Sequence, residues 1–408
     1  MQSVESYRSE IFAAITPLEP ENLPLTEAGG AVLAADVTAS WPLPGFDNSA
    51  MDGYAVLAAD VATADGQSPV TLIVDSEAAA GDTASHTVTP GRCVKIMTGA
   101  LLPTGADAVI PVEWTDGGST AADGTPTVLI RQSAEKGTAI RLAGGDARPG
   151  DLLLAAGTRL GPAQIGVLAA AGHGTVQARR RPRVTVISTG NELAEPGSAL
   201  VPGMIWDSNS YMLAAAARQA GCEVTRHPTL RDDPQVVLAA ISHAAATADL
   251  LITSGGVSMG GEHDVVKAAL TKLGTVTFRK VAMQPGMPQG FGLLGPSRTP
   301  IFTLPGNPVS AFVSFRIFVE PALGALQGLP AQRSASSRAR LAGPVRSPAG
   351  KTSFLRGTLD QEGAAVHPLT GQNSHQIASL AKANALIVVP EQVTDLPAGE
   401  VVEVLELP

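Results

Sequence analysis

Residues 253–264 read TSGGVSMGGEHD and directly follow the apolar residues 250–252. The apolar run predicts a buried strand, and residues 265–270 predict a helix after the turn. Glycines let backbone N–H groups approach a ligand closely, and the beginning of a helix carries a partial positive charge. This junction is therefore typical of an anion-binding turn, for example for a phosphate. Its two acids, Glu262 and Asp264, would repel a bare phosphate, so we expect a divalent cation between them and the anion.

Two more segments combine an apolar strand with a polar turn that contains glycine. Residues 183–187 lead into STGNEL at 188–193, and residues 300–304 lead into PGNPVS at 305–310. Ligands of open α/β sheets bind at the carboxyl ends of the strands. We therefore expect the three turns to form one composite site.

Residues 183–326 alternate between strand and helix patterns, which predicts a parallel-sheet α/β domain with right-handed crossovers. The strands expected in this domain cover residues 183–187, 222–225, 250–253, 276–281, 291–294 and 301–304. Over the whole chain, the expected helices cover residues 4–15, 162–171, 209–220, 234–246, 266–272 and 307–326.

Two other regions predict β structure. Residues 46–140 contain short apolar runs separated by Gly, Asp, Thr and Pro turns, which indicates an all-β domain. Short strands from about residue 336 to 408 fit a small β-barrel or a β-sandwich. Prolines and glycines favour domain boundaries near residues 41–45 and 328–330.

The bulk composition limits the function classes. The chain of 408 residues has 44% hydrophobic residues and a formal net charge of −9, which argues against a nucleic-acid-binding protein. Cys93 and Cys222 have no metal-ligand spacing and fit a reducing compartment. The chain begins without the pattern of a signal peptide and has no apolar run of about 18 residues. We therefore expect a cytoplasmic protein without a membrane span.

Several motifs leave two interpretations open. The glycine turn at 255–261 is neither a Walker A loop nor a dinucleotide fingerprint, so it is either a structural turn or an anion site. In RDDP at 231–234, one aspartate can cap the following helix, which leaves the other free. Asn307 either points into the site or caps a helix. The basic run at 179–183 is either a solvated linker or a positive rim for an anionic ligand.

The loop FDNSAMDGYAV at 46–56 combines acids, an amide and a hydroxyl before a strand, and it is either solvated or part of a site. The seven histidines show no metal-ligand spacing.

Six segments together resemble the molybdopterin molybdenumtransferase family, to which bacterial MoeA and the E domain of gephyrin belong. The resemblance spans the whole chain, and its motifs occur in the family's order. They are PGFDNSAMDGYAV at 44–56, MTGALLPTGADAVIPVE at 97–113, STGNEL at 188–193, RDDP at 231–234, SGGVSMGGEHD at 254–264 and LPGNPVSAF at 304–312.

The resemblance implies four domains and a reaction. The domains are an elongated linking domain at 1–45 with 141–177, an all-β domain at 46–140, a molybdopterin-binding α/β domain at 178–327 and a small β-barrel at 328–408. The substrates are adenylated molybdopterin and molybdate. The adenylate is cleaved with Mg²⁺, molybdenum enters the dithiolene, and AMP leaves. Carboxylates that hold a cation, loop N–H groups and a lysine suit this chemistry.

The resemblance also implies partners. The family is dimeric, and its site lies between the α/β domain of one subunit and the β-domain of the other. Further expected partners are a molybdopterin adenylyltransferase and maturation factors of molybdoenzymes. Binding to nucleic acid or to a membrane is not expected.

The family motifs also assign roles to residues of this chain. The implied catalytic residues are Asp52, Thr98, Glu192, Asp232, Asp264 and Lys280. Three of them, Glu192, Asp232 and Asp264, are the implied metal ligands. The implied substrate-binding residues are Thr189, Gly190, Ser254, Gly255, Gly256, Ser258, Pro305, Gly306, Asn307 and Ser310.

Two departures from the family pattern concern oxyanion binding. The glycine loop is one glycine longer than the common GVSMGE, which affects the placing of Glu262 and Asp264. Gln284 and Met287 stand where many members have lysines. A non-catalytic scaffold and an unrelated phosphotransferase remain alternative functions. The family acids favour catalysis over a scaffold, and the missing Walker lysine argues against the phosphotransferase.

Overall fold

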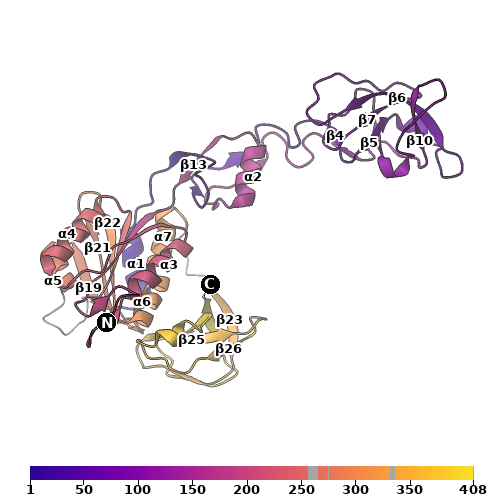
Figure 1. Ribbon diagram of the computed structural model, residues 1–408. Helices are drawn as coiled ribbons and strands as arrows, with labels where there is room; N and C mark the ends of the chain where they lie inside the picture. The colour runs from indigo at the N-terminus through magenta and orange to yellow at the C-terminus, as the bar shows by residue number, and fades with distance from the viewer. Residues whose placement is uncertain (256–264, 274, 331–335, 408) are drawn as a thin grey trace. The chain divides into compact units, whose positions relative to one another are not determined.

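The computed structural model describes residues 1–255, 265–273, 275–330 and 336–407. The chain forms two compact units (Figure 1). Unit 1 contains Met1–Leu23, Ala28–Ala34 and Gln177–Pro408, and unit 2 contains Pro24–Glu27 and Ala35–Val176. The expected four-domain boundaries remain a prediction.

A six-stranded sheet forms the centre of unit 1, and helices cover both of its faces (Figure 1). In spatial order its strands are β17 (Glu223–Arg226), β14 (Arg183–Ser188), β18 (Leu250–Ser254), β22 (Thr299–Leu304), β21 (Pro288–Leu294) and β19 (Val276–Lys280). The helices are α1 (Val4–Ala14), α3 (Asn209–Gln219), α4 (Pro234–Ala245), α5 (Val265–Leu273), α6 (Pro308–Ser314) and α7 (Glu320–Leu326). The expected α/β domain is confirmed, but its sheet is mixed rather than entirely parallel as predicted.

The sheet is parallel at its centre and antiparallel towards one edge. Strands β17, β14, β18 and β22 are parallel neighbours, whereas β21 pairs with both β22 and β19 in antiparallel register. Only residues 295–298 separate β21 from β22. So short a connection cannot hold a crossover helix, so the chain must turn back on itself.

Side-chain alternation along the central strands fills two cores. Val184, Val186 and Ile252 face the cluster that includes helices α1, α3, α6 and α7. Ile187 and Leu251 face the opposite cluster, which includes α4 and α5. Because alternate residues of a strand point to opposite faces, these buried apolar runs require helices on both sides.

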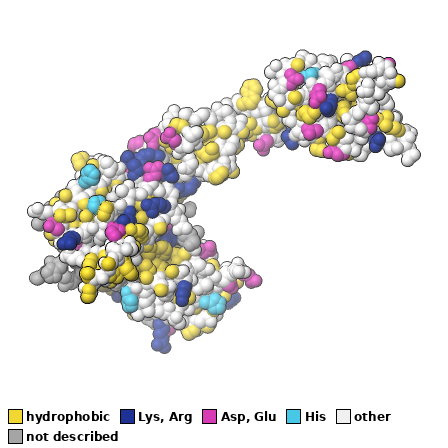
Figure 2. All heavy atoms as spheres, in the orientation of Figure 1, with side chains coloured by type: hydrophobic (Ala, Val, Ile, Leu, Met, Phe, Trp, Pro, Cys, Tyr) yellow, Lys and Arg dark blue, Asp and Glu magenta, His cyan; other side chains and the backbone are white. Residues whose placement is uncertain are grey.

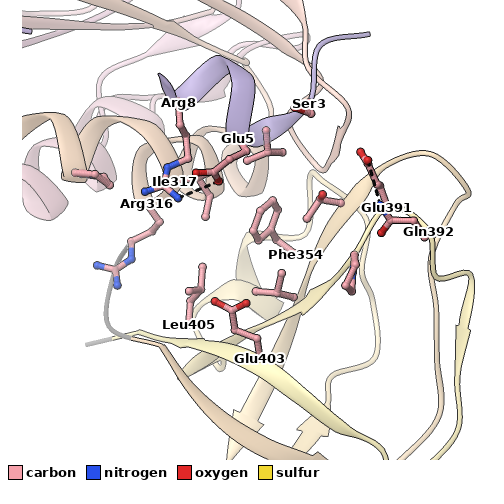
Figure 3. A pocket seen from close by; sticks show the side chains of 15 residues that line it. Ser3, Glu5, Arg8, Arg316, Ile317, Phe354, Glu391, Gln392, Glu403 and Leu405 are labelled. Carbon is pink, nitrogen blue, oxygen red and sulfur yellow. Dashed lines mark hydrogen bonds and ion pairs between the residues drawn. The ribbon is translucent and has the colours of Figure 1, made fainter. Parts of the chain in front are cut away.

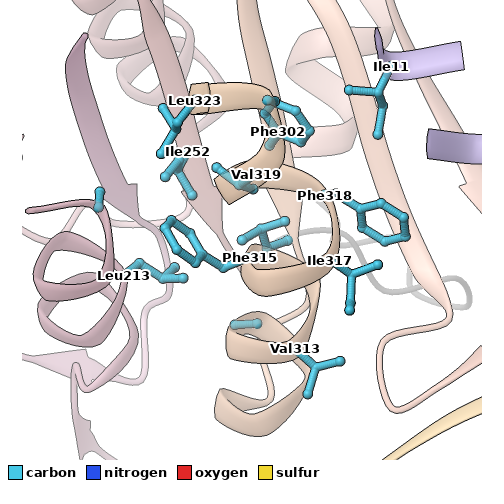
Figure 4. Packing of buried hydrophobic residues seen from close by; sticks show 14 of the residues in the cluster. Ile11, Leu213, Ile252, Phe302, Val313, Phe315, Ile317, Phe318, Val319 and Leu323 are labelled. Carbon is cyan, nitrogen blue, oxygen red and sulfur yellow. The ribbon is translucent and has the colours of Figure 1, made fainter. Parts of the chain in front are cut away.

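Residues 307–326 were expected to form one closing helix, and the structure divides the run into α6, a π-helical segment at Phe315–Val319, and α7. Figure 4 shows Phe315 and Phe318 of this run among Phe302, Leu213 and Ile11. The helix Pro308–Leu326 has the length and apolarity of a membrane-crossing helix, but 78% of the apolar window is buried within the protein. Its apolar character is therefore explained by the core.

Helix α1 packs into the core of the α/β sheet. Tyr7 and Ile11 are almost fully buried, and the Tyr7 ring meets the Phe318 ring edge-on at a centroid distance of 5.0 Å. This packing places helix α1 in unit 1. A strip of apolar residues predicts an amphipathic helix but not the partner that covers it.

A closed five-stranded barrel forms the C-terminal part of unit 1, as expected. The strands β23 (Ser336–Leu341), β26, β25, β27 and β29 pair in this order, and β29 closes the ring on β23. The other bounds are β25 (Thr352–Leu359), β26 (Ala365–Pro368), β27 (Ala385–Val389) and β29 (Val401–Glu406). The short strand β20 (Met283–Gln284) joins β25 in parallel register, which ties the barrel to the α/β part.

Unit 2 contains a second six-stranded sheet, which confirms β structure within residues 46–140. In order its strands are β8 (Ala108–Pro111), β5 (Gly53–Val56), β7 (Arg92–Ile96), β6 (Val70–Ala78), β10 (Pro126–Ile130) and β9 (Ser119–Thr120). Other elements of unit 2 are α2 (Pro162–Ala170), β3 (Val37–Thr38) with β12 (Leu152–Leu154), and β4 (Asn48–Ser49) with β11 (Ile140–Arg141). The helix expected at 162–171 is thereby confirmed.

Candidate functional site

The carboxyl ends of β14, β18 and β22 lie level with one another. Ser188 is the register partner of Ser254, and Ser254 is the partner of Leu304. The Thr189 N–H donates to the Ser254 carbonyl at 3.2 Å, and the Gly255 N–H donates to the Leu304 carbonyl at 3.4 Å. The three turns that the sequence singled out therefore begin side by side at one edge of the sheet.

Gly255 is required where the turns meet. Its φ of +93° lies in the left-handed region, and a Cβ on it would lie 2.5 Å from the Thr189 carbonyl oxygen. A Cβ on Gly306 would lie 3.8 Å from the Gly255 Cα, so the third turn is close as well. The buried Thr189 hydroxyl has no hydrogen-bond partner among the described residues. Such an orphaned polar group beside backbone amides fits a site that receives a polar ligand.

Two of the implied acids flank the turn after β14. The Asn191 N–H donates to the Asp232 carboxylate at 3.3 Å, and the Asp232 N–H donates back to the Asn191 side chain at 3.1 Å. The Glu192 carboxylate folds over Gly190, where a Cβ would lie 2.7 Å from Glu192 Oε2. Among the described residues, Lys and Arg form no ion pair with either acid. Both carboxylates thus remain available to a cation.

The adjacent Asp233 has a different role. Its carboxylate accepts hydrogen bonds from the N–H groups of Gln235 and Val236, at 2.8 and 3.2 Å, and thereby caps α4. The structure resolves the ambiguity of RDDP: Asp233 is the cap, and Asp232 is the acid that remains.

Asn307 connects the third turn to the barrel. It occupies the N-cap position of α6, but its side chain makes no capping hydrogen bond. Instead its amide donates to Ser374 Oγ at 2.9 Å, and the Ser374 carbonyl accepts from the Val309 N–H at 3.0 Å. Ser310 lies buried in the first turn of α6. No sequence motif indicates Ser374, because it lies 67 residues from Asn307 in the chain.

Lys280 is the last residue of β19 and is exposed. Because β19 and β22 are both antiparallel to β21, they run in the same direction, so Lys280 lies at the edge of the sheet that carries the turns. Gln284 is exposed in β20, which pairs with the barrel strand β25. The catalytic role that the family motifs imply for Lys280 stays a prediction.

The implied pair in unit 2 is joined directly. Asp52 Oδ1 accepts hydrogen bonds from the Thr98 N–H and from the Thr98 hydroxyl, both at 2.7 Å. These bonds, first that from the backbone N–H, hold the pKa of the exposed Asp52 carboxyl below its ordinary value. Asp52 precedes β5, and Gly53 is required there because a Cβ would clash with the Ile110 carbonyl of β8 at 1.9 Å.

Some expectations concern residues outside the described part of the chain. Gly256, Ser258, Glu262 and Asp264 belong to this group, so the extra glycine of the loop and the third implied metal ligand are not described. The described residues contain no cluster of three or more His, Cys, Asp or Glu that could hold a metal. Mg²⁺ binding by Glu192 and Asp232 with Asp264 stays a prediction.

The basic run at 179–183 lies away from the turns. Arg183 begins β14, whereas the site lies where β14 ends. Asp249 accepts two hydrogen bonds from Arg180, at 2.6 and 2.9 Å, and one from the Arg183 N–H at 2.7 Å. The position of this run and its contacts with Asp249 argue against the interpretation of residues 179–183 as a positive rim for an anionic ligand. On the face drawn in Figure 2, Lys and Arg side chains likewise lie among Asp and Glu.

A cavity of about 320 Å³ lies elsewhere in unit 1, between α1, the helical run 308–326 and the barrel. Figure 3 shows Arg8, Arg316, Phe354 and Glu403 around it. Among the described residues, none that the family motifs imply lines this cavity. It is therefore separate from the candidate site.

The sequence motifs do not single out the segment at residues 207–210. The buried Asp207 carboxyl group accepts hydrogen bonds from Ser188, Ser210 and Thr229. The Asn209 amide donates to Ser254 Oγ and to the Gly306 carbonyl, at 2.8 and 2.7 Å. The position of this segment before a helix was its only signal, because its partners lie far along the chain.

Comparison with known proteins identifies the family. Residues 2–172 match the MoeA N-terminal region (domain I and II), residues 185–325 a probable molybdopterin binding domain, and residues 338–407 the MoeA C-terminal region (domain IV). A Mycobacterium tuberculosis protein named molybdopterin molybdenumtransferase 2 is 45% identical over 413 residues, covering 100% of both chains. A Haemophilus influenzae protein named molybdopterin molybdenumtransferase is 35% identical, covering 99% of this chain and 98% of its own.

The architecture agrees with this likeness. The crystal structure of a molybdopterin biosynthesis MoeA protein from Pyrococcus horikoshii matches 99% of this chain and 98% of its own, with 33% identity and a TM-score of 0.78. The chain belongs to the molybdopterin molybdenumtransferase family, because it shares sequence identity with these relatives over its full length, matches three successive domains and has the same architecture.

Proposed function

We propose that this protein is an enzyme of molybdenum cofactor biosynthesis that inserts molybdenum from molybdate into adenylated molybdopterin. Water hydrolyses the pyrophosphate link between pterin and adenylate, which releases AMP, and the dithiolene sulfurs bind the molybdenum of molybdate while molybdate oxygen leaves as water. The names of the full-length relatives support this transferase activity.

One arrangement carries the proposal. Three polar turns begin level with one another at one sheet edge, and two acids without an ion pair to any described Lys or Arg flank the first turn. A phosphoanhydride substrate needs backbone N–H groups for its oxygens and a means of neutralising its charge. The orphaned Thr189 hydroxyl adds a polar group for the ligand.

Mg²⁺ fits this donor set. Glu192 and Asp232 offer carboxylate oxygens, which Mg²⁺ prefers, and Mg²⁺ sites commonly combine one or two carboxylates with substrate phosphates. When bound, Mg²⁺ would neutralise charge on the pyrophosphate link. The chain's own residues have the other tasks: the turns bind and orient the phosphates, and Lys280 contributes a positive charge at the same edge.

We further propose a cytoplasmic homodimer in which each site combines residues of both subunits. Asp52 and Thr98 of one subunit would complete the site around Glu192 and Asp232 of the other. The hydrogen bonds from Thr98 lower the pKa of Asp52, so its carboxylate stays charged further into the acid range, which suits a role beside a cation. A molybdopterin adenylyltransferase would supply the substrate, and maturation factors of molybdoenzymes would receive the product.

AMP release from adenylated molybdopterin tests the proposal, with and without molybdate and Mg²⁺. The adjacent aspartates provide a matched pair of variants. Asp232→Asn should abolish AMP release, whereas Asp233→Asn should retain it, because asparagine also caps a helix well. Asp52→Ala and Asp264→Ala should also abolish release while the protein stays folded.

Three results would contradict the proposal. Pterin binding without Mg²⁺- and molybdate-dependent turnover would favour a scaffold. ATP hydrolysis in place of AMP release would favour a phosphotransferase. Equal loss in Asp232→Asn and Asp233→Asn would contradict the assignment of Asp232, rather than Asp233, as the acid of the site.

A further inference from the structure

Residues 207–210, with the sequence DSNS, contact all the turns of the candidate site. We infer that this segment positions the site, with Asp207 and Asn209 as its positioning residues. The inference rests on the proposed function for the reaction that it serves, but its structural part concerns only contacts within unit 1.

Asp207 joins three parts of the chain. Its carboxyl group, which is 1% exposed, accepts from Ser188 Oγ at 3.2 Å and from Thr229 Oγ1 at 3.0 Å. It also accepts from the N–H and the hydroxyl of Ser210, at 3.0 and 2.6 Å. A buried polar group with four hydrogen bonds fixes the elements that supply them. Asp207 thus fixes the end of β14, the beginning of α3 and the segment before Asp232.

Those bonds reach the two acids through short backbone links. The Leu230 N–H donates to the Ser188 carbonyl at 2.9 Å, and the Gly190 N–H donates to the Leu230 carbonyl at 3.1 Å. Glu192 lies two residues after Gly190, and Asp232 lies two residues after Leu230. The separation of the two carboxylates therefore depends on the bonds of Asp207.

Asn209 joins the other two turns. Its amide nitrogen donates to Ser254 Oγ at 2.8 Å and to the Gly306 carbonyl at 2.7 Å. The Ser254 hydroxyl in turn donates to the Pro305 carbonyl at 3.4 Å. One amide group, held at the first residue of α3, thereby sets the spacing between the end of β18 and the turn after β22.

The two residues should affect different kinetic constants. Asn209 holds turns proposed to bind substrate, so its loss should act mainly on KM. Asp207 holds the spacing of the two acids, so its loss should act mainly on kcat. A misplacement of about 1 Å can lower a rate roughly 100-fold. A purely structural role would lower the amount of folded enzyme and leave both constants unchanged.

The test compares wild-type protein with Asn209→Ala, Asn209→Asp and Asp207→Asn. Asn209→Asp keeps the size and removes the donor, so both changes at position 209 should raise KM for adenylated molybdopterin by roughly tenfold. Asp207→Asn keeps the shape and should lower kcat by about 10- to 100-fold. Asn384→Ala is the matched control, because that amide bridges the backbone of Leu359 in the barrel, at 2.6 and 3.0 Å.

Hydrogen–deuterium exchange provides a readout that needs no turnover. Asn209→Ala should accelerate exchange in peptides covering residues 250–255 and 299–307, and Asn384→Ala should leave those peptides unchanged. Wild-type exchange rates in Asn209→Ala, or unchanged KM and kcat in all three variants, would overturn the inference. Wild-type protein that fails to release AMP would instead refute the proposed function, while the exchange result would still decide the positioning role.

Discussion

Gly255→Ala tests whether the close approach of two turns is essential to the site. The φ of +93° is unfavourable for alanine, which costs about 1–2 kcal/mol. The added Cβ would also lie 2.5 Å from the Thr189 carbonyl, and overpacking of this kind costs about 1–3 kcal/mol. We therefore expect local destabilisation of about 2–5 kcal/mol.

Gly197→Ala is the matched control. Gly197 has a φ of +88° but nothing within 4 Å of an added Cβ, so alanine there meets only the backbone cost. The difference between the two variants isolates the contact with Thr189. The free energy of local opening is measured by hydrogen exchange of β14 and β18, and AMP release is measured in parallel.

The two assays should separate the variants. Gly255→Ala should reduce kcat/KM for AMP release about 100-fold, because the Thr189 and Ser254 turns are displaced. Gly197→Ala should release AMP at the wild-type rate. If Gly255→Ala matched Gly197→Ala in both assays, the turns would not need their close approach, and the steric argument would be refuted.

Three further perturbations have defined outcomes. Thr98→Val removes one of the hydrogen bonds that lower the pKa of Asp52. Activity that needs the carboxylate is lost as pH falls through this pKa, so the acid limb of the pH–rate profile should move to higher pH in the variant. An acid limb at the wild-type pH would contradict the role of Thr98. Asp249→Asn, at the opposite edge of the sheet, should lower the free energy of unfolding by about 3 kcal/mol, because it leaves Arg180 without its closest partner. Asp395→Asn, in the exposed ion pair with Arg346, should lower it by about 0–1 kcal/mol in the same urea titration. Both variants should release AMP normally when folded. Chelation of Mg²⁺ by EDTA should stop AMP release, and Glu192→Gln should raise the Mg²⁺ concentration needed for half-maximal rate; an unchanged Mg²⁺ requirement would exclude Glu192 as a ligand.

The pH dependence of Asp249 follows from its surroundings. Burial opposes its ionisation, but hydrogen bonds from Arg180 and Arg183 outweigh burial and hold the pKa of Asp249 below its ordinary value. A lowered folded-state pKa contributes stability above the unfolded-state pKa of about 4, and this contribution is lost as pH falls through the folded-state pKa. The stability gap between wild type and Asp249→Asn should therefore narrow under acid conditions.

Local sequence signals determined the elements and the three turns. Helix and strand periodicities depend on neighbouring residues, so the sequence predicted α3, α4 and β18 close to their observed bounds. The carboxyl ends of parallel strands must meet at one edge, which placed the turns together. The family motifs paired Asp52 with Thr98 in one site, and the structure joins them by two hydrogen bonds.

The tertiary structure decided what depends on partners distant in the chain. Asn209 lies 45 residues from Ser254 and 97 from Gly306, and no local pattern encodes such contacts. The sequence likewise leaves open which of Asp232 and Asp233 caps α4, and only the observed hydrogen bonds at the beginning of that helix assign the cap to Asp233. The sequence also leaves the role of the basic run at 179–183 open. The structure shows that Arg180 and Arg183 donate hydrogen bonds to Asp249, at the sheet edge opposite the turns. Periodicity is a short-range property, whereas side-chain hydrogen bonds form only between groups that the fold brings within about 3 Å.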